Sequence, residues 1–212
     1  MNITKTILCF GDSNTWGMSP DGSRYSEQQR WTAILSRTLS KNYNVIEAGE
    51  PNRTLMNGSP FESSDSNKAS GKKYSQPYLA NQQVSLVIVM LGTNDLKKRF
   101  AHHITQIAEA TASLVEQIWQ YSEQTYQQRC KVLVVAPTPI YEVGAYKSIY
   151  QGGELKSKQL VAELLKISQK IGCDFLDAGS IVSACKEEGV HWPEQEHMRF
   201  AKALASKIAM LY

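Results

Sequence analysis

Short apolar runs alternate along the chain with longer segments in which apolar residues recur every three or four positions. The run at 86–91 (LVIVML) is apolar throughout, which is typical of a strand buried on both faces of a parallel sheet. The other runs that predict strands lie at 6–10, 43–48, 131–136 and, with a weaker pattern, 174–176.

Helical spacing predicts helices between these strands. Each helical segment gathers its apolar residues on one stripe, as expected of a helix that packs against a sheet. The segments lie at 27–40, at about 103–121, at 155–171 and after Pro193. This alternation predicts an α/β fold: a three-layer α/β/α, doubly wound arrangement with a flavodoxin-like, five-stranded parallel sheet.

Two segments show no regular period. Residues 56–77 are rich in Ser, Asn, Gly and Lys, and residues 137–153 are rich in aromatic residues and Gly. Irregular segments of this length in a compact domain are commonly functional loops or disordered. Since 212 residues is an ordinary length for one domain, we expect a single domain over 1–212, with both segments bordering its functional site.

Composition excludes several classes of protein. Apolar residues make up 42% and charged residues 20%, which are values of a globular chain. A net charge of +3, without any run of five like charges, argues against nucleic-acid partners. No apolar stretch reaches the ~18 residues of a membrane span, and the first residues lack a signal-peptide pattern. The four cysteines show neither CxxC nor metal-ligand spacing, so we expect a cytoplasmic protein with reduced thiols and no metal.

Polar residues follow the predicted strands at the edge where open parallel sheets bind ligands. The segment 11–17 (GDSNTWG) follows the first strand, 49–54 the second and 92–95 (GTND) the third, and His191 lies beyond the fifth. A serine hydroxyl needs a nearby base to act as a nucleophile, and an imidazole is the natural base at neutral pH. The loops also offer N–H donors that could stabilise a developing oxyanion. The serine hydroxyl, the imidazole and these donors together are suited to acyl transfer.

Each of these residues also has a simpler interpretation. Ser13 could be a helix N-cap, Asn94 a turn residue and His191 a surface histidine. The GDSNTWG turn could hold a phosphate, although it lacks the Walker lysine and the GxGxxG spacing. The combination at the ends of different strands favours acyl transfer.

The chain resembles the SGNH hydrolase superfamily, which comprises the GDSL esterases and lipases. The blocks that carry the resemblance are 11–13 (GDS), 92–95 (GTND) and the stretch that ends at His191. Similarity to the arylesterase and acyltransferase branch covers nearly the whole chain and includes 90–100 (MLGTNDLKKRF) and 131–140 (KVLVVAPTPI). The resemblance implies a serine esterase without a cofactor.

The resemblance also implies roles for individual residues. Ser13 would be the nucleophile and His191 the general base. The oxyanion hole would consist of the backbone N–H groups of Ser13 and Asn52 together with the side-chain amide of Asn94. The family usually has glycine at the position of Asn52, but only a backbone N–H is needed there, and Asn tolerates a positive φ.

A second departure from the family concerns the acid that orients the base. The family has aspartate three residues before the histidine, and this chain has Glu188. Three interpretations are open: Glu188 orients His191, Glu187 or a backbone carbonyl does so, or the enzyme is impaired or has drifted to another role. The question matters because a misoriented base can cost a factor of ~10⁴ in rate.

Further polar residues near these motifs are expected to have structural roles. The resemblance implies that Asp12 ties neighbouring loops together, and we expect Arg53 and Asp95 to belong to the same network. The histidines on predicted helix starts or faces are His102, His103 and His197.

Five aromatic residues fall on or near the predicted rim of the site: Trp16, Tyr25, Phe100, Tyr141 and Trp192. Trp16 and Trp192 are the candidates for contact with substrate, although at least two of the five are expected to pack the core instead. An apolar rim would suit a small ester with a hydrophobic alcohol, and a dry site would favour acyl transfer over hydrolysis.

The expected substrate is therefore a small ester with a short acyl group, and the resemblance makes acetyl the first choice. The alternatives are acyl transfer to an alcohol, O-deacetylation of carbohydrates, and a binding module of the same fold without turnover. Because relatives often form homo-oligomers that narrow the entrance to the site, we also expect a homo-oligomer with contacts at the two irregular segments.

Overall fold

The fold is built on one sheet of five parallel strands, seen in a computed structural model that describes residues 4–39, 41–56 and 76–212. The strands are β1 (Lys5–Gly11), β2 (Tyr43–Gly49), β3 (Leu86–Met90), β4 (Lys131–Ala136) and β5 (Asp174–Asp177). Their order in the sheet is β2-β1-β3-β4-β5, and every neighbouring pair is parallel. This is the flavodoxin-like order, so the predicted fold class is confirmed.

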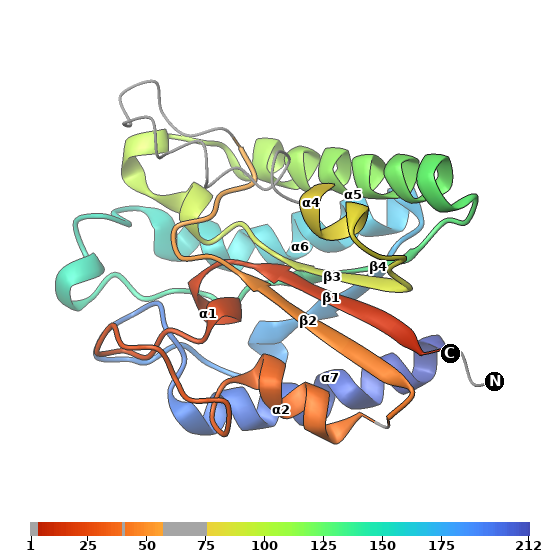
Figure 1. Cartoon of the computed structure of the whole chain (residues 1–212). Helices are drawn as coiled ribbons and strands as arrows, with labels where there is room; N and C mark the ends of the chain where they lie inside the picture. The colour runs from red at the N-terminus through yellow and green to blue at the C-terminus, as the bar shows by residue number, and fades with distance from the viewer. Residues whose placement is uncertain (1–3, 40, 57–75) are drawn as a thin grey trace.

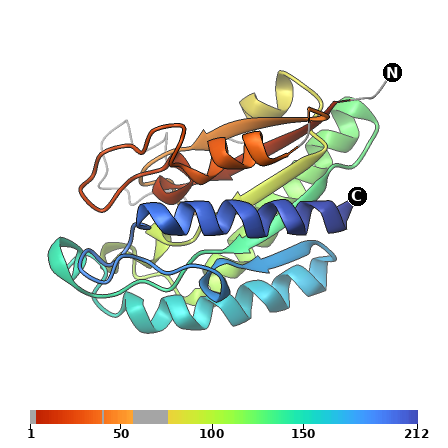
Figure 2. The same ribbon diagram turned by 90° about the horizontal axis from the view of Figure 1, so that it is seen from below.

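Helices cover both faces of the sheet (Figure 1). The helices on one face are α4 (Gln76–Ala80), α5 (Ile104–Tyr126) and α6 (Gly153–Ile171). The helices on the other face, nearest the viewer in Figure 2, are α2 (Trp31–Thr38) and α7 (Glu194–Leu211). None of the helices in the described part of the chain is long and apolar enough to cross a membrane.

The strands divide the apolar core into two layers because successive side chains point to opposite faces. In β1, Leu8 and Phe10 pack in the cluster that includes α5 and α6, whereas Ile7 and Cys9 pack in the cluster that includes α2 and α7. All five residues of β3 are buried, which explains why its sequence is apolar without alternation.

The ends of several elements differ from the sequence-based expectation. Helix α2 begins at Trp31 rather than at residue 27, because residues 26–30 form a turn in which the Ser26 carbonyl accepts from the backbone N–H groups of Gln29 and Arg30. Helix α5 runs five residues beyond the expected end at residue 121 and stops at Gln127, which has a positive φ of 53°. Of the irregular segment 56–77, only residues 56, 76 and 77 are described, so the prediction for this segment lies outside the described residues.

Candidate active site

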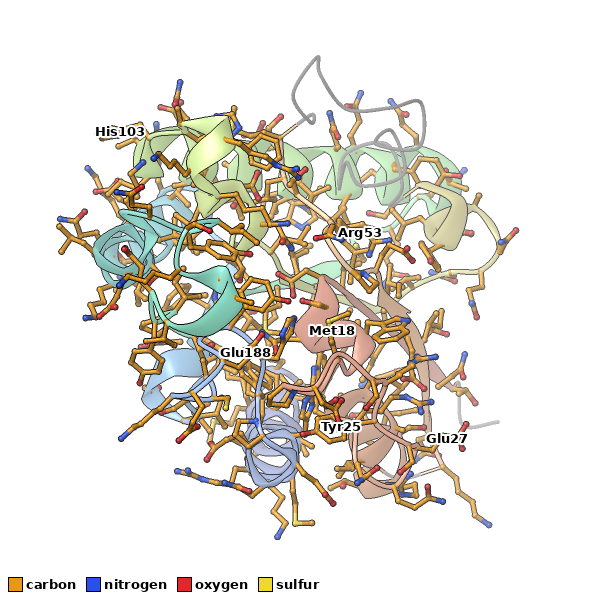
Figure 3. All side chains as sticks on the ribbon, turned by 90° about the vertical axis from the view of Figure 1, so that its left-hand side faces the viewer. Met18, Tyr25, Glu27, Arg53, His103 and Glu188 are labelled. Atoms are coloured by element: carbon orange, nitrogen blue, oxygen red, sulfur yellow. The ribbon has the colours of Figure 1, made fainter. Side chains whose placement is uncertain are left out.

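The loops at the carboxyl ends of the strands lie together at the left of Figure 1, and Figure 3 looks directly at them. Strand β1 ends at Gly11, and a short helix, α1 (Ser13–Trp16), starts two residues later. A Cβ at Gly11 would lie 2.0 Å from Thr15 Oγ1 and 2.8 Å from the Met90 carbonyl oxygen, so only glycine fits this turn. The side chain of Asp12 caps the helix by accepting from the Asn14 backbone N–H at 3.1 Å. Ser13 is thereby fixed at the first residue of α1.

The imidazole of His191 reaches Ser13 from the opposite end of the sequence. His191 lies in the loop between β5 and α7, and its Nε2 is 3.0 Å from Ser13 Oγ across a sequence separation of 178 residues. Both side chains are buried. This distance is within the hydrogen-bond reach that a general base needs.

The carboxylate that faces the ring belongs to Glu188. Its Oε1 is 2.6 Å from His191 Nδ1, while its Oε2 accepts from the backbone N–H groups of Val190 at 2.8 Å and His191 at 2.7 Å. Burial alone would raise the pKa of Glu188, but hydrogen bonds and the charge of His191 outweigh burial and hold it below its ordinary value. Glu187 turns away and accepts from the thiol of Cys185. Of the two candidate acids, the structure therefore places Glu188 against the imidazole, near the centre of Figure 3.

The two asparagines expected to bind an oxyanion follow β2 and β3. Asn52 has a positive φ of 66°, the conformation that this residue tolerates well. Its Oδ1 accepts from Lys97 Nζ at 2.8 Å, so a buried lysine holds the turn. Asn94 lies at the start of a 3₁₀ turn (Asn94–Leu96), where its Nδ2 donates to the Arg53 carbonyl at 3.1 Å and its Oδ1 accepts from Tyr150 Oη at 3.2 Å.

A network of buried charged groups holds the loop after β2 against the sheet. The guanidinium of Arg53 donates to the carbonyls of Gly11 and Ala48. These two hydrogen bonds link the end of β1 to the end of β2. The carboxylate of Asp95 accepts from the backbone N–H groups of Leu55 and Met56 at 2.9–3.0 Å. Burial raises the pKa of Asp95 to about 7. These contacts are of the structural kind expected for Arg53 and Asp95.

The structure does not bear out the expected position of Trp192. Its side chain is fully buried, packs on Phe200 and His197 in the core, and donates through Nε1 to Thr138 Oγ1 at 2.9 Å. The Trp192 side chain is therefore part of the core and does not line the rim of the site. Trp16 keeps partial exposure, with the guanidinium of Arg24 4.9 Å from its ring centroid. Tyr25, Phe100 and Tyr141 are also partly exposed, so Trp192 is the fully buried member of the five.

The three histidines outside the site differ in how far they are buried. His103 is exposed at the start of α5, at the periphery of Figure 3. His102 stacks on the ring of Phe100. His197 is fully buried on α7, where its Nδ1 accepts from the Trp31 backbone N–H at 3.3 Å. Burial lowers the pKa of His197 to about 3, so the ring is neutral.

Three residues that contact the site were not singled out from the sequence. The ring of Tyr146 packs edge-on against His191 with centroids 5.6 Å apart, and Tyr150 bonds to Asn94. Both belong to the aromatic segment 137–153, which the sequence did predict to border the site. The third is Asn14, whose position directly after Ser13 was its only signal in the sequence.

A family model described as GDSL-like lipase/acylhydrolase matches residues 7–204. The chain belongs to this family. Several solved structures resemble it over almost its full length. Est24, a carbohydrate acetylesterase from Sinorhizobium meliloti, has 32% sequence identity and a TM-score of 0.90 over 98% of this chain and 100% of its own. A comparison with curated proteins found no match.

Two further structures are described as an aryl esterase and a putative arylesterase. The aryl esterase of M. smegmatis has 33% identity and a TM-score of 0.90, with 98% of this chain and 100% of its own covered. A putative arylesterase from Agrobacterium tumefaciens str. C58 has 28% identity and a TM-score of 0.86 over the same shares.

Within the described ranges, no group of three or more His, Cys, Asp or Glu side chains is placed to hold a metal ion in this GDSL-like hydrolase.

Proposed function

We propose that this GDSL-like hydrolase is a serine esterase that removes short acyl groups from small esters. The observation that carries the proposal is the continuous chain of contacts from Glu188 through His191 to Ser13, with 2.6 Å and 3.0 Å between the paired atoms. Such a chain is the requirement for activating a serine hydroxyl at neutral pH.

In the proposed reaction, Ser13 Oγ attacks the ester carbonyl while His191 Nε2 accepts its proton. Glu188 keeps the proton of the ring on Nδ1 and stabilises the imidazolium that forms. The carbonyl oxygen becomes an oxyanion, which would accept from the backbone N–H groups of Ser13 and Asn52 and from the second amide hydrogen of Asn94.

The reaction then continues in two stages, formation of an acyl-enzyme and its hydrolysis. The bond to the leaving alcohol breaks as His191 returns the proton to the alcohol oxygen, which leaves the acyl group on Ser13. Water attacks this acyl-enzyme while His191 takes a proton from the water, and His191 returns the proton to Ser13 Oγ as the bond to the acyl group breaks and the acid leaves. If an alcohol attacked in place of water, the product would be a new ester, which is acyl transfer. Analysis of the products formed in the presence of an added alcohol measures this reaction.

Acetyl is the acyl group we propose, because two of the similar structures are described as carbohydrate acetylesterases. Aryl esterases are similar to the same degree, so an aryl acetate and an acetylated sugar are the two substrates to compare. Release of acetate from acetylated xylan at a rate comparable with p-nitrophenyl acetate would favour the carbohydrate O-deacetylase.

Substitution of Ser13 by alanine tests the proposal. Ser13→Ala should lower p-nitrophenyl acetate turnover by at least ~10³-fold and abolish labelling by a fluorophosphonate, because the nucleophile is lost. The matched control is Ser206→Ala, which removes an exposed hydroxyl on α7 and should change neither readout. Full turnover by a folded Ser13→Ala variant would contradict the proposal. Wild-type protein that binds an ester without turnover and without an adduct would indicate the non-catalytic binding module instead.

A further inference from the structure

The side chain of Asn14 makes hydrogen bonds on both sides of His191. Its Nδ2 donates to the Val190 carbonyl at 3.2 Å, and its Oδ1 accepts from the Trp192 backbone N–H at 3.1 Å. The Asn14 side chain is buried, so the loss of either bond would leave a buried polar group without a partner. One carboxamide thus spans the residue that we propose as the base.

Asn14 is itself held at both of its backbone polar groups. Its N–H donates to Asp12, and its carbonyl accepts from Trp31 Nε1 at 2.9 Å. Since it directly follows Ser13 in helix α1, it has little freedom to move relative to the nucleophile. A loop that is hydrogen-bonded to the Asn14 side chain is therefore held at a fixed distance from Ser13.

The loop around His191 also has bonds within itself and one to the segment 137–153, whose Tyr141 N–H donates to the Gly189 carbonyl at 2.8 Å. Glu188 accepts from the N–H groups of Val190 and His191, and the His191 carbonyl accepts from the Cys185 N–H at 2.8 Å. None of these bonds joins the loop to helix α1. Apart from the contact between His191 and Ser13 themselves, the two bonds of the Asn14 carboxamide make that connection.

The residue type at this position also differs from the motif after which the family is described. The four letters GDSL denote Gly-Asp-Ser-Leu, whereas this chain reads Gly-Asp-Ser-Asn at 11–14. A leucine side chain has neither a donor nor an acceptor, so it cannot make either of the bonds of Asn14.

We propose that Asn14 is a positioning residue that holds His191 at hydrogen-bond distance from the Ser13 oxygen throughout the reaction. This inference rests on the proposed esterase function. Its importance is greatest in the acyl-enzyme, because Ser13 Oγ is then esterified and has no proton to donate to His191. The bonds of Asn14 do not change when Ser13 is acylated, and they keep the base in place for the attack of water.

The first test compares Asn14→Leu with the wild-type protein on p-nitrophenyl acetate. We expect kcat to fall ~10–100-fold and kcat/KM to fall less, since deacylation depends most on the position of His191. The variant should therefore show a larger burst of p-nitrophenol before the steady state. A second variant, Asn14→Asp, keeps the size of the side chain and the acceptor for Trp192 but loses the donor to Val190. It should change kcat in the same direction, and it replaces Asn14→Leu in the test if that variant does not fold.

A double-mutant cycle separates positioning from a general loss of stability. In a His191→Ala background, Asn14→Leu should change the residual rate by less than about twofold, because no base remains to be positioned. Equal losses in both backgrounds would overturn the inference. Amide hydrogen exchange at Trp192 gives a readout without catalysis and should become faster in Asn14→Leu.

The outcomes distinguish this inference from the function on which it rests. Wild-type kcat in Asn14→Leu, together with inactive Ser13→Ala and His191→Ala variants, would overturn the role of Asn14 and leave the esterase proposal intact. Full activity in Ser13→Ala would refute the esterase proposal and, with it, the role of Asn14 in the reaction. Unchanged exchange at Trp192 in Asn14→Leu would contradict the positioning contact itself.

Discussion

At the scale of single residues, Glu188 shows what one additional methylene group allows in place of the family's aspartate. Its two carboxylate oxygens reach the imidazole of His191 and two backbone N–H groups of the same turn. The glutamate therefore fixes both the ring and the backbone that carries it. This geometry favours a working acid over an impaired one.

Replacement of Glu188 by glutamine should lower kcat by ~10²–10⁴-fold, because the amide loses the negative charge that stabilises the imidazolium and can present a donor to the Nδ1 proton. Steady-state kinetics with p-nitrophenyl acetate measures the loss. Glu187→Gln is the matched control: it changes the neighbouring carboxylate, which bonds to Cys185 and not to the ring, and it should keep activity within about threefold of wild type. A loss as large in Glu187→Gln as in Glu188→Gln would contradict the assignment.

The sequence predicted the positions of residues that closely follow a strand, but it did not predict the directions of side chains in loops. Ser13 and Asn94 follow β1 and β3 closely, so the topology alone brings them to one edge of the sheet. Trp192 is next to His191 in the chain, but its ring turns into the core to meet Phe200. A loop has no fixed period, so the sequence could not predict which of two neighbouring side chains faces the site.

At the scale of elements, the segment 137–153 connects the proposed base to the proposed oxyanion hole. It has little regular structure beyond the 3₁₀ turn Gly144–Tyr146. Backbone bonds hold it at both ends of its course, from Tyr141 N–H to the Gly189 carbonyl at 2.8 Å and from Lys98 N–H to the Ile149 carbonyl at 2.8 Å. These bonds attach it to the loop of His191 on one side and to the residues after Asn94 on the other.

Tyr150→Phe tests whether this segment orients Asn94. Burial raises the pKa of Tyr150 well above its ordinary value of 10, so its hydroxyl remains a donor at any practical assay pH. Loss of one hydrogen bond of about 1 kcal/mol should allow the Asn94 amide to reorient and lower kcat ~5–10-fold, with a smaller change in KM. Tyr146→Phe keeps the ring against His191 and should stay within about twofold of wild type. Equal kcat in wild type and Tyr150→Phe would show that Asn94 is oriented without this bond.

The elements themselves were largely predictable because each has a strong apolar period. The start of α2 was not, since the apolar stripe says nothing about the turn that Ser26 closes with Gln29. Helix α4 was also missed, because its five residues are too few to show a helical period.

At the scale of the whole molecule, buried ionisable groups link stability to pH in opposite directions. Burial lowers the pKa of His197 to about 3, so below its ordinary pKa of ~6.5 the unfolded chain binds a proton that the folded chain does not. Stability from His197 is therefore lost as the pH falls from 6.5 toward 3. Burial raises the pKa values of Asp12 to about 6 and Asp95 to about 7, so their contribution is greatest at acid pH and is lost as the pH rises through 6 to 7.

Substitution of His197 by asparagine isolates one of these contributions. From pH 7.5 to pH 5.0, proton uptake by the unfolded state at His197 should lower the free energy of unfolding by about 2 kcal/mol in the wild type. His197→Asn should lack this component while retaining an acceptor for the Trp31 N–H, and the aspartates are the same in both proteins. Urea unfolding at the two pH values measures the difference. The exposed His103→Asn control should follow the wild type, and an unchanged pH dependence in His197→Asn would contradict the argument.

The wide separation of Ser13 and His191 along the chain has a consequence for biosynthesis. At ~5–20 residues per second, a ribosome needs roughly 10–35 s to travel the 178 residues from the proposed nucleophile to its proposed base. During that time the proposed nucleophile lacks its proposed base, so we expect a product of translation that stops before His191 to lack esterase activity. On the proposed mechanism, the chain therefore gains its esterase activity only when its synthesis is nearly finished.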